Sequence, residues 1–511
     1  MVEEIKPKTL NNFYFRVDNN QKEVFMARDR WPTTLTFILA AIGSAVGLGN
    51  VWRFPYLSYK YGGGAFLLPY LIALFVSGIP LLILEFGLGQ KMQKGAVDSF
   101  AAIKRKFSTI GWWALFTSFI VISYYAVVMA WSIIYFFVSF GVQWSADPEN
   151  YFFTNVLNLS SGIGDIGGIT LTVFIALFVS WVLVYFCVWK GTKSVSKVVM
   201  WTVPIPILLL VVLLIRVLTL DGFLAGWIVY LTPNFNALLD TEVWIAAFAQ
   251  IFFSLSLAFG VMVAYSSLNK KKENVAKNAF VVGITNSSIS ILAGFVVFGT
   301  LGFMATHQGV NVSEVVSSGP GLAFVVFPKA LSLMPWPTII SLLFFLTLIT
   351  LAIDSAFSLV EAINITVMDK TKWKRELIAL VVCGLGFLVG ILYTTGAGLY
   401  FLDLVDHFVT NFNLIIIGIL ECIAVGWVYG AEKLRRYVNK VSSIKIGKWW
   451  NFTIKYLTPL ILIVILVLQV KAEIAANYGG YPLWAIMIGW AVVIIPLIIA
   501  YLIPQKEVKA G

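Results

Sequence analysis

Apolar runs of membrane-spanning length recur along this chain, from residue 31 to residue 503. A helix needs about 20 predominantly apolar residues to cross the hydrocarbon core of a bilayer. Twelve such runs can be marked, and 59% of the residues are hydrophobic whereas only 12% are charged. Soluble domains carry about 25% charged residues, so the pattern predicts an all-α polytopic membrane protein without a sizeable soluble domain.

The loops between these runs differ in charge. Clusters of Lys and Arg follow the second, fourth, sixth, eighth and tenth runs, whereas the other loops carry acids such as Asp147, Glu149 and Glu314. Because cytoplasmic loops are enriched in basic residues, we expect a multi-pass protein of the cell (plasma) membrane with both termini in the cytoplasm. The net charge of +11 is then a topology signal, and residues 1–30 form a cytoplasmic tail. The partner that this charge indicates is the lipid bilayer, not nucleic acid.

The first apolar run is interrupted by three closely spaced glycines. Gly43, Gly47 and Gly49 are followed by Asn50 and Arg53 inside what should be a membrane span. Glycine costs about 1 kcal/mol relative to alanine in a helix interior, so this stretch favours a broken helix. Backbone groups freed at membrane depth need protein, water or a ligand as partners. The interruption therefore predicts a binding site.

A second interruption lies in the sixth run, where Gln250, Ser254, Ser256 and Gly260 occur in mid-membrane. The first and sixth runs begin two halves of five spans, residues 31–220 and 221–430, and residues 431–511 add two more spans. Halves with an odd number of spans insert in opposite orientations. Matching breaks in inverted halves indicate a transport site near the bilayer midplane, although close packing of small residues is an alternative explanation.

Three motifs now carry a resemblance. The chain reads GSAVGLGNVWRFP at 43–55, GGGAF at 62–66 and GIPLLILE at 78–85, and WIAA at 244–247 precedes the second break. From about residue 28 to residue 504 the sequence resembles the neurotransmitter:sodium symporter family. The resemblance implies the LeuT fold, with twelve transmembrane helices, an inverted 5+5 repeat and broken helices 1 and 6. It also implies sodium-coupled uptake of an amino acid or related amine by alternating access, without enzymatic chemistry.

Ionisable groups at membrane depth are rare and usually functional, and Asp354 is the clearest one in this chain. A sodium ion takes oxygen ligands such as carbonyls, hydroxyls and carboxylates. The resemblance implies two sodium sites, one of which is completed by the carboxylate of the substrate. That first site comprises Ala45, Asn50, Ser254 and Asn286, and the second comprises Gly43, Val46, Leu351, Asp354 and Ser355.

A chloride site also follows from the resemblance. Chloride-independent bacterial relatives have a glutamate on span 7 where this chain has Ser290, four residues after Asn286 and on the same helix face. The matching chloride-coordinating set is Tyr70, Gln250, Ser254, Asn286 and Ser290. We therefore expect a bound chloride that offsets part of the sodium charge. The alternative is that Ser290 only packs against a neighbouring helix.

Gly47 bears on the substrate, because monoamine transporters of this family have an aspartate at the matching position. Glycine there favours an amino acid, whose carboxylate would meet backbone amides, sodium and the Tyr125 hydroxyl. By resemblance the substrate-binding residues are Ala45, Gly47, Gly49, Val121, Tyr125, Phe253, Ser254, Ser256, Phe259, Ser355 and Leu359. The side-chain pocket is apolar apart from two hydroxyls, which indicates a neutral hydrophobic amino acid. A leucine-like and an aromatic substrate both stay open.

The resemblance also implies two gates. Outside the site, Arg53 would pair with Asp406 on span 10, and Tyr125 and Phe253 would close beneath them. Inside, the expected latch is formed by Arg28, Trp31 and Asp369. Leu268 replaces a tyrosine that is usual at the end of span 6, so this latch lacks one hydroxyl. For Arg53 the alternative is an interfacial anchor whose side chain reaches toward water.

Two other functions remain open at this point. An ion channel predicts a continuous polar pore, but the polar residues here cluster at the two breaks. A non-transporting amino acid sensor of the same fold would bind without flux. Neither a phosphate loop nor a His/Cys constellation supports an enzyme, and a homodimer is possible.

Overall fold

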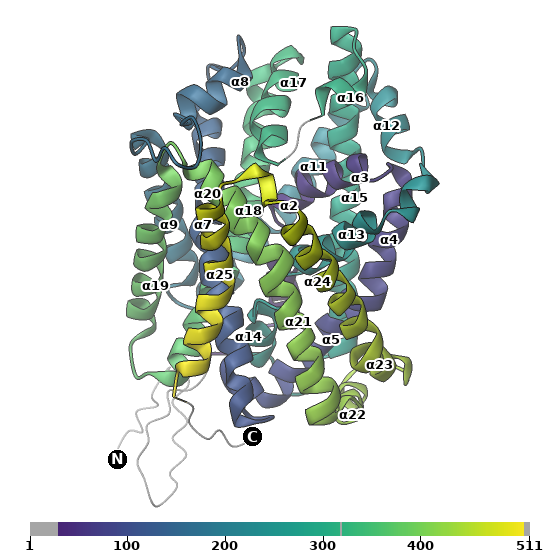
Figure 1. Ribbon diagram of the computed structural model, residues 1–511, viewed down its shortest axis with the longest axis vertical. Coiled ribbons are helices and arrows are strands. Elements are labelled where there is room, and N and C mark those ends of the chain that lie inside the picture. Colours follow the sequence, from purple (N-terminus) through teal and green to yellow (C-terminus); the bar gives the residue numbers. More distant parts are fainter. Residues whose placement is uncertain (1–28, 317–318, 505–511) are drawn as a thin grey trace, which may run out of the picture.

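The computed structural model describes residues 29–316 and 319–504, and Figure 1 shows a bundle of long helices that run mostly along one axis. Within these residues there is no β-strand; two isolated bridges join Gly63 to Pro233 and Ile169 to Thr395. Ten helical stretches in this part of the chain are long and apolar enough to cross a membrane, and one bent pair makes an eleventh span. The prediction of an all-α polytopic membrane protein is confirmed.

The helices before residue 240 are α1 (Thr34–Ala45), α2 (Leu48–Val51), α3 (Arg53–Lys60), α4 (Leu67–Ala73), α5 (Ile79–Met92), α6 (Ala96–Ala101), α7 (Ser108–Val138), α8 (Pro148–Asn150), α9 (Leu171–Val188), α10 (Thr192–Thr202), α11 (Pro204–Val217) and α12 (Phe223–Leu231). Short 3-10 or π-helical segments join them: η1 (Gly64–Phe66), η2 (Leu74–Gly78), η3 (Arg105–Phe107), η4 (Tyr151–Val156) and η5 (Phe235–Leu239).

The helices after residue 240 are α13 (Thr241–Ser254), α14 (Val261–Ser267), α15 (Val275–Gln308), α16 (Val312–Val315), α17 (Phe327–Leu333), α18 (Pro337–Lys370), α19 (Arg375–Gly390), α20 (Gly398–Phe408), α21 (Leu414–Ile423), α22 (Ala431–Val441), α23 (Trp449–Phe452), α24 (Thr458–Ala475) and α25 (Leu483–Leu502). The joining segments are η6 (Leu322–Val326), η7 (Ile391–Thr394), η8 (Val409–Asn413), η9 (Ala424–Gly430), η10 (Thr453–Leu457) and η11 (Tyr478–Gly480).

The first span breaks where the glycines predict it. Helix α1 begins after Thr33, whose side chain accepts a hydrogen bond from the Thr36 amide, and it ends at Ala45. Val46 and Gly47 are extended, and the chain resumes as α2 and α3 at an angle of 61° to α1. This bent pair is the eleventh span. The break leaves backbone amides and carbonyls of residues 43–49 without a continuous helical ladder.

The second break separates α13 from α14. Ser256 and Ala258 adopt positive φ angles of 51° and 64°, which are strained for residues other than glycine. Gly260 has a φ of 73° and starts α14 without that strain. Neither α13 nor α14 alone is long enough to cross a bilayer, but together they occupy the position of the expected sixth span. With this pair, the twelve spans and two broken helices expected of the LeuT fold are accounted for.

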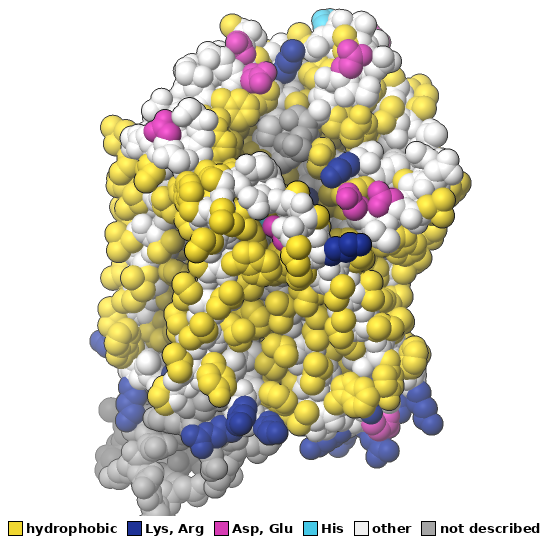
Figure 2. Space-filling model, viewed as in Figure 1, with side chains coloured by type: hydrophobic (Ala, Val, Ile, Leu, Met, Phe, Trp, Pro, Cys, Tyr) yellow, Lys and Arg dark blue, Asp and Glu magenta, His cyan; other side chains and the backbone are white. Residues whose placement is uncertain are grey.

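The molecular surface matches a membrane orientation. In Figure 2 hydrophobic side chains cover the middle of the molecule, Lys and Arg gather at its lower end, and Asp and Glu lie mostly at the upper end. At the upper end of Figure 1 the connection between spans 7 and 8 forms the short helices α16 and α17. Helix α12 was not anticipated, because its nine residues are too few for a span.

Candidate functional site

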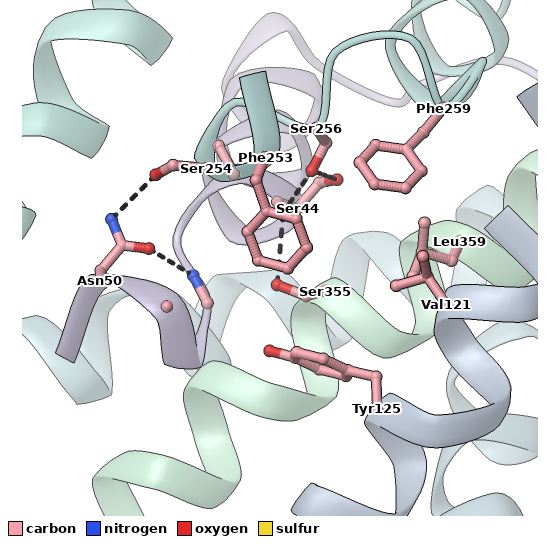
Figure 3. A pocket seen from close by; sticks show the side chains of 13 residues that line it. Ser44, Asn50, Val121, Tyr125, Phe253, Ser254, Ser256, Phe259, Ser355 and Leu359 are labelled. Carbon is pink, nitrogen blue, oxygen red and sulfur yellow. Dashed lines mark hydrogen bonds between the residues drawn. The ribbon is translucent and has the colours of Figure 1, made fainter. Parts of the chain in front are cut away.

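A small cavity lies where the two breaks meet, between α7 and α18 (Figure 3). All eleven residues predicted to bind substrate line it, together with Ser44 and Asn50: Ala45, Gly47, Gly49, Val121, Tyr125, Phe253, Ser254, Ser256, Phe259, Ser355 and Leu359. The volume of this cavity is about 30 Å³, and its exposed surface is mainly apolar. The fold therefore brings residues from separate spans to one point.

Gly47 is tightly surrounded by side chains of other helices. A Cβ atom placed on it would lie 2.8 Å from the Ser355 Oγ and 2.9 Å from the Tyr125 hydroxyl. The Gly47 amide donates to Asn50 Oδ1 at 2.9 Å, and the Leu48 amide donates to the Tyr125 hydroxyl at 3.2 Å. The break thus offers backbone and hydroxyl hydrogen-bond donors but has no room for an acidic side chain of its own.

One group of oxygen-bearing side chains surrounds Asn50. Its amide nitrogen donates to Asn286 Oδ1 at 2.9 Å and to Ser254 Oγ at 3.3 Å. Ser254 Oγ also lies 3.1 Å from Asn286 Oδ1. These three residues and Ala45, which lines the cavity beside them, are those predicted for the first sodium site. All of them are buried.

A second group surrounds Asp354, which is 2% exposed at the middle of α18. A Cβ on Gly43 would lie 2.8 Å from Asp354 Oδ2, so the backbone of the break passes directly over this carboxylate. Ser355 Oγ donates to the Gly43 carbonyl at 3.4 Å, and Leu351 lies one helical turn before Ser355. Val46 is buried at the end of α1. Thr202 of α10 donates to Asp354 Oδ1 at 2.6 Å, a contact that sequence reasoning missed.

The residues predicted to hold chloride also converge. Ser290 Oγ accepts from the Asn50 amide at 2.7 Å and from the Tyr70 hydroxyl at 3.4 Å. Gln250 is fully buried, and within the described part of the chain neither its amide nitrogen nor its amide oxygen has a hydrogen-bond partner. A buried amide without a partner costs free energy unless a ligand or water satisfies it. The set therefore fits a small ion.

On the side expected to face outward, Arg53 and Asp406 form an ion pair with 3.9 Å between Nη1 and Oδ2. The Arg53 guanidinium also stands 5.1 Å from the centre of the Phe253 ring. Tyr124, which sequence reasoning missed although it precedes Tyr125, donates to Asp406 Oδ1 at 2.7 Å. Tyr125 and Phe253 line both the central cavity and a vestibule of about 630 Å³ above it. These two rings separate the cavity from the vestibule.

On the side expected to face the cytoplasm, the Trp31 indole donates to the Tyr265 carbonyl at 2.8 Å and so holds the start of α1 against α14. Asp369 accepts from the Gly95 amide at 2.8 Å. Arg28, the expected partner of Asp369, lies outside the described residues. An ion-paired group of Arg375, Asp29 and Glu361 stands near this end of the bundle and was not anticipated from the sequence.

Hydroxyl groups connect the two breaks at the cavity wall. Ser44 Oγ lies 2.8 Å from Ser358 Oγ of α18, and Ser256 Oγ donates to the Ser44 carbonyl at 2.8 Å. Glu85 of α5 accepts from the Ala258 amide at 2.9 Å and so supports the second break. Sequence reasoning gave no role to Ser44 or Ser358, since a serine in an apolar span usually only packs.

Comparison with known proteins shows which family the sequence matches. The model of the sodium:neurotransmitter symporter family matches residues 28–146 and 141–508. An uncharacterized sodium-dependent transporter of Methanocaldococcus jannaschii is 41% identical over 95% of this chain and 99% of its own length. A sodium- and chloride-dependent taurine transporter of Rattus norvegicus is 35% identical over 94% and 85% of the two chains, respectively. A sodium- and chloride-dependent creatine transporter of Bos taurus is 36% identical over 91% and 81%.

Proposed function

The chain belongs to the sodium:neurotransmitter symporter family, whose members are transporters and not enzymes, and from this premise we propose that it imports a neutral hydrophobic amino acid by alternating access. It is a sodium-dependent symporter in a membrane. The proposal adds the substrate class, two sodium sites, a chloride ion and named roles for residues.

The observation that carries the substrate proposal is the space around Gly47. Ser355 Oγ and the Tyr125 hydroxyl occupy the place where a side chain would extend, so no acid from the protein can meet the substrate's amine there. A carboxylate of the substrate would instead replace Asn50 Oδ1 and the Tyr125 hydroxyl as acceptors for the Gly47 and Leu48 amides. Taurine and creatine, which name two relatives, each carry an anionic group, in agreement with an anion at this point.

The side chain of the substrate would lie among Val121, Phe259 and Leu359. These residues come from α7, the second break and α18, and together they make an apolar wall. The nearby hydroxyls of Ser44, Ser256 and Ser355 have hydrogen-bond partners within the protein. Because those hydroxyls need no substrate group, an apolar side chain is favoured over a polar one.

Coupling to sodium would come from shared ligands. We assign the first sodium to Ala45, Asn50, Ser254 and Asn286, and the carboxylate of the substrate completes its shell. The second sodium is assigned to Gly43, Val46, Leu351, Asp354 and Ser355. The first sodium ion and the substrate would then each supply part of the other's binding site. Each would therefore raise the affinity of the other by the same factor.

Chloride is assigned to Tyr70, Gln250, Ser254, Asn286 and Ser290. The support is the partnerless Gln250 amide beside a set of neutral donors, with no acid among the five residues. An anion here would offset part of the charge of two sodium ions in a site from which water is largely excluded. The names of the taurine and creatine transporters include chloride dependence, which agrees with this assignment.

Alternating access would use the two gates. The pair Arg53–Asp406 with Tyr125 and Phe253 closes the outer path, and Arg28, Trp31 and Asp369 close the inner one. The two five-span halves, residues 31–220 and 221–430, would move relative to each other in a plasma membrane with both termini in the cytoplasm. A homodimer is compatible with this mechanism, which needs only one chain.

Uptake into proteoliposomes tests the proposal. A panel of labelled amino acids is offered with sodium and chloride gradients imposed independently. We expect concentrative uptake of a neutral hydrophobic amino acid that needs sodium and falls when gluconate replaces chloride. Binding without uptake would instead indicate the sensor, and sodium currents that persist without substrate would indicate a channel.

A further inference from the structure

A histidine and a glutamate form a close pair beside the outer gate. His407 lies near the end of α20, and its Nε2 is 2.6 Å from Glu473 Oε1 of α24. Their side chains are only 10% and 6% exposed. Within the described residues, Glu473 Oε2 is buried and has no hydrogen-bond partner. A carboxylate that is largely removed from water with one short contact carries an incompletely compensated negative charge.

The remaining faces of the imidazole are also occupied. Nδ1 lies 3.0 Å from the side-chain amide nitrogen of Asn411. The oxygen of the same amide accepts a hydrogen bond from Gln469 at 3.4 Å. The Tyr478 ring stacks on the imidazole with 3.5 Å between centroids and 13° between planes. Nδ1 therefore faces an amide nitrogen and Nε2 faces a carboxylate, so both ring nitrogens have a partner within the protein. A proton taken up at this site is shared by the imidazole and the carboxylate.

The charged and titratable groups that line the two cavities beside this pair come from several elements. They are Tyr400, Asp403 and Asp406 on α20, Lys471 on α24, Tyr478 in η11 and Tyr481 after it, Arg53, Tyr56 and Lys60 on α3, Tyr61 after α3, Tyr124 and Tyr125 on α7, and Glu242 on α13. Tyr478 and Tyr481 both donate to Asp403, at 3.1 and 3.0 Å. Arg53 is engaged with Asp406, so it does not neutralise Glu473.

The pair is connected to the gate through short links. Asp406, the gate acid, directly precedes His407 in α20. Tyr478 contacts the imidazole with its ring and Asp403 with its hydroxyl, and so ties the turn between α24 and α25 to α20. His407 and Tyr478 line both the vestibule and a neighbouring cavity of about 550 Å³ between α3, α13 and α24. The His407–Glu473 pair therefore lies at the wall of the vestibule.

We propose that His407 and Glu473 form a proton-binding site that regulates the outer gate. With one added proton, the pair is neutral overall and the packed wall of α20, α24 and η11 is favoured. Without that proton, the buried charge of Glu473 stands near Asp403 and Asp406, and hydration of the wall favours an open vestibule. External acid would therefore stabilise the closed vestibule. The inference rests on the proposed function, since it assumes that Arg53 and Asp406 form the outer gate.

Histidine is the side chain that changes charge between about pH 5 and pH 8. We expect sodium-driven uptake to fall about three- to tenfold as the external pH goes from about 8 to about 5.5 at fixed ion gradients and clamped voltage. His407→Gln, which cannot take the proton, keeps the fast uptake at both pH values. Glu473→Gln, which is permanently neutral, keeps the slow uptake at both. His307→Gln, the matched control at the only other histidine, exposed on α15, retains the wild-type pH response.

Accessibility of the vestibule provides a readout that needs neither substrate nor sodium. Leu399→Cys places a thiol in the vestibule wall, and the native cysteines Cys187, Cys383 and Cys422 are buried. The rate at which a thiosulfonate reagent modifies this thiol is measured at each pH, with and without the His407→Gln substitution. Because both proteins carry the same thiol, comparing them at equal pH removes the effect of thiol ionisation on the rate. Acid protection that is lost in H407Q supports the proposal, and the same pH response with and without the substitution overturns it. Protection without any amino acid uptake would leave the proton site standing and refute the proposed function.

Discussion

Replacing Gly47 by alanine perturbs the proposed carboxylate site by a single methyl group. The added carbon would stand 2.8 Å from Ser355 Oγ and 2.9 Å from the Tyr125 hydroxyl, closer than such atoms approach in proteins. Tyr125 sits on the long rigid helix α7 and Ser355 on α18, so relief requires side-chain or backbone displacement. Overpacking of this kind costs about 1–3 kcal/mol. If the substrate-bound state bears that cost, the apparent KM rises about fivefold to about 150-fold.

The assay is initial-rate uptake in proteoliposomes as a function of amino acid concentration, at saturating sodium. The control is Gly384→Ala on the exposed face of α19, where an added Cβ meets no atom within 4 Å. That variant should behave as wild type, and equal size-exclusion profiles would show that both variants fold. An unchanged KM in G47A, with the control also unchanged, would refute the argument that Gly47 keeps space for the substrate's carboxylate.

Three further predictions follow from the other sites. Asp354→Asn removes the carboxylate of the second sodium site, so the sodium concentration for half-maximal uptake should rise about tenfold or more, and an unchanged sodium dependence would exclude this assignment. Ser290→Glu places a fixed negative charge at the proposed chloride site, so uptake should become independent of chloride; retained chloride dependence would argue against the site. Asp406→Asn weakens an ion pair that is partly exposed and 3.9 Å long. Because such pairs contribute little free energy, we expect only about a two- to threefold change in KM. A loss of all uptake would mean that Asp406 has a role in transport beyond the outer gate.

The features that could be predicted from the sequence are those with a local cause. The positions of the spans follow from runs of apolar residues, and the breaks near Gly47 and Gly260 follow from glycine and polar residues at membrane depth. The residues around the cavity followed from the resemblance, because the motif at residues 43–55 is long and specific. The placement of these residues around one cavity agrees with that expectation, and their roles stay proposals.

The features that escaped prediction depend on contacts between distant helices. Thr202 reaches Asp354 only because α10 packs beside α18, and a threonine in an apolar span carries no signal of that contact. Tyr124 points toward Asp406 whereas its neighbour Tyr125 faces the break, a difference set by the turn of about 100° between consecutive helical residues. His407 and Glu473 are separated by 66 positions in the sequence, so their pairing requires the packed structure of α20 against α24.

The most direct test of the account is equilibrium binding of a neutral hydrophobic amino acid to the purified protein with and without sodium. The account places the substrate's carboxylate in the coordination shell of the sodium bound by Asn50, Ser254 and Asn286. It predicts that saturating sodium lowers the dissociation constant of the amino acid by about fivefold to about 150-fold, with the same factor for sodium when the amino acid is saturating. An amino acid affinity that is the same with and without sodium would contradict it.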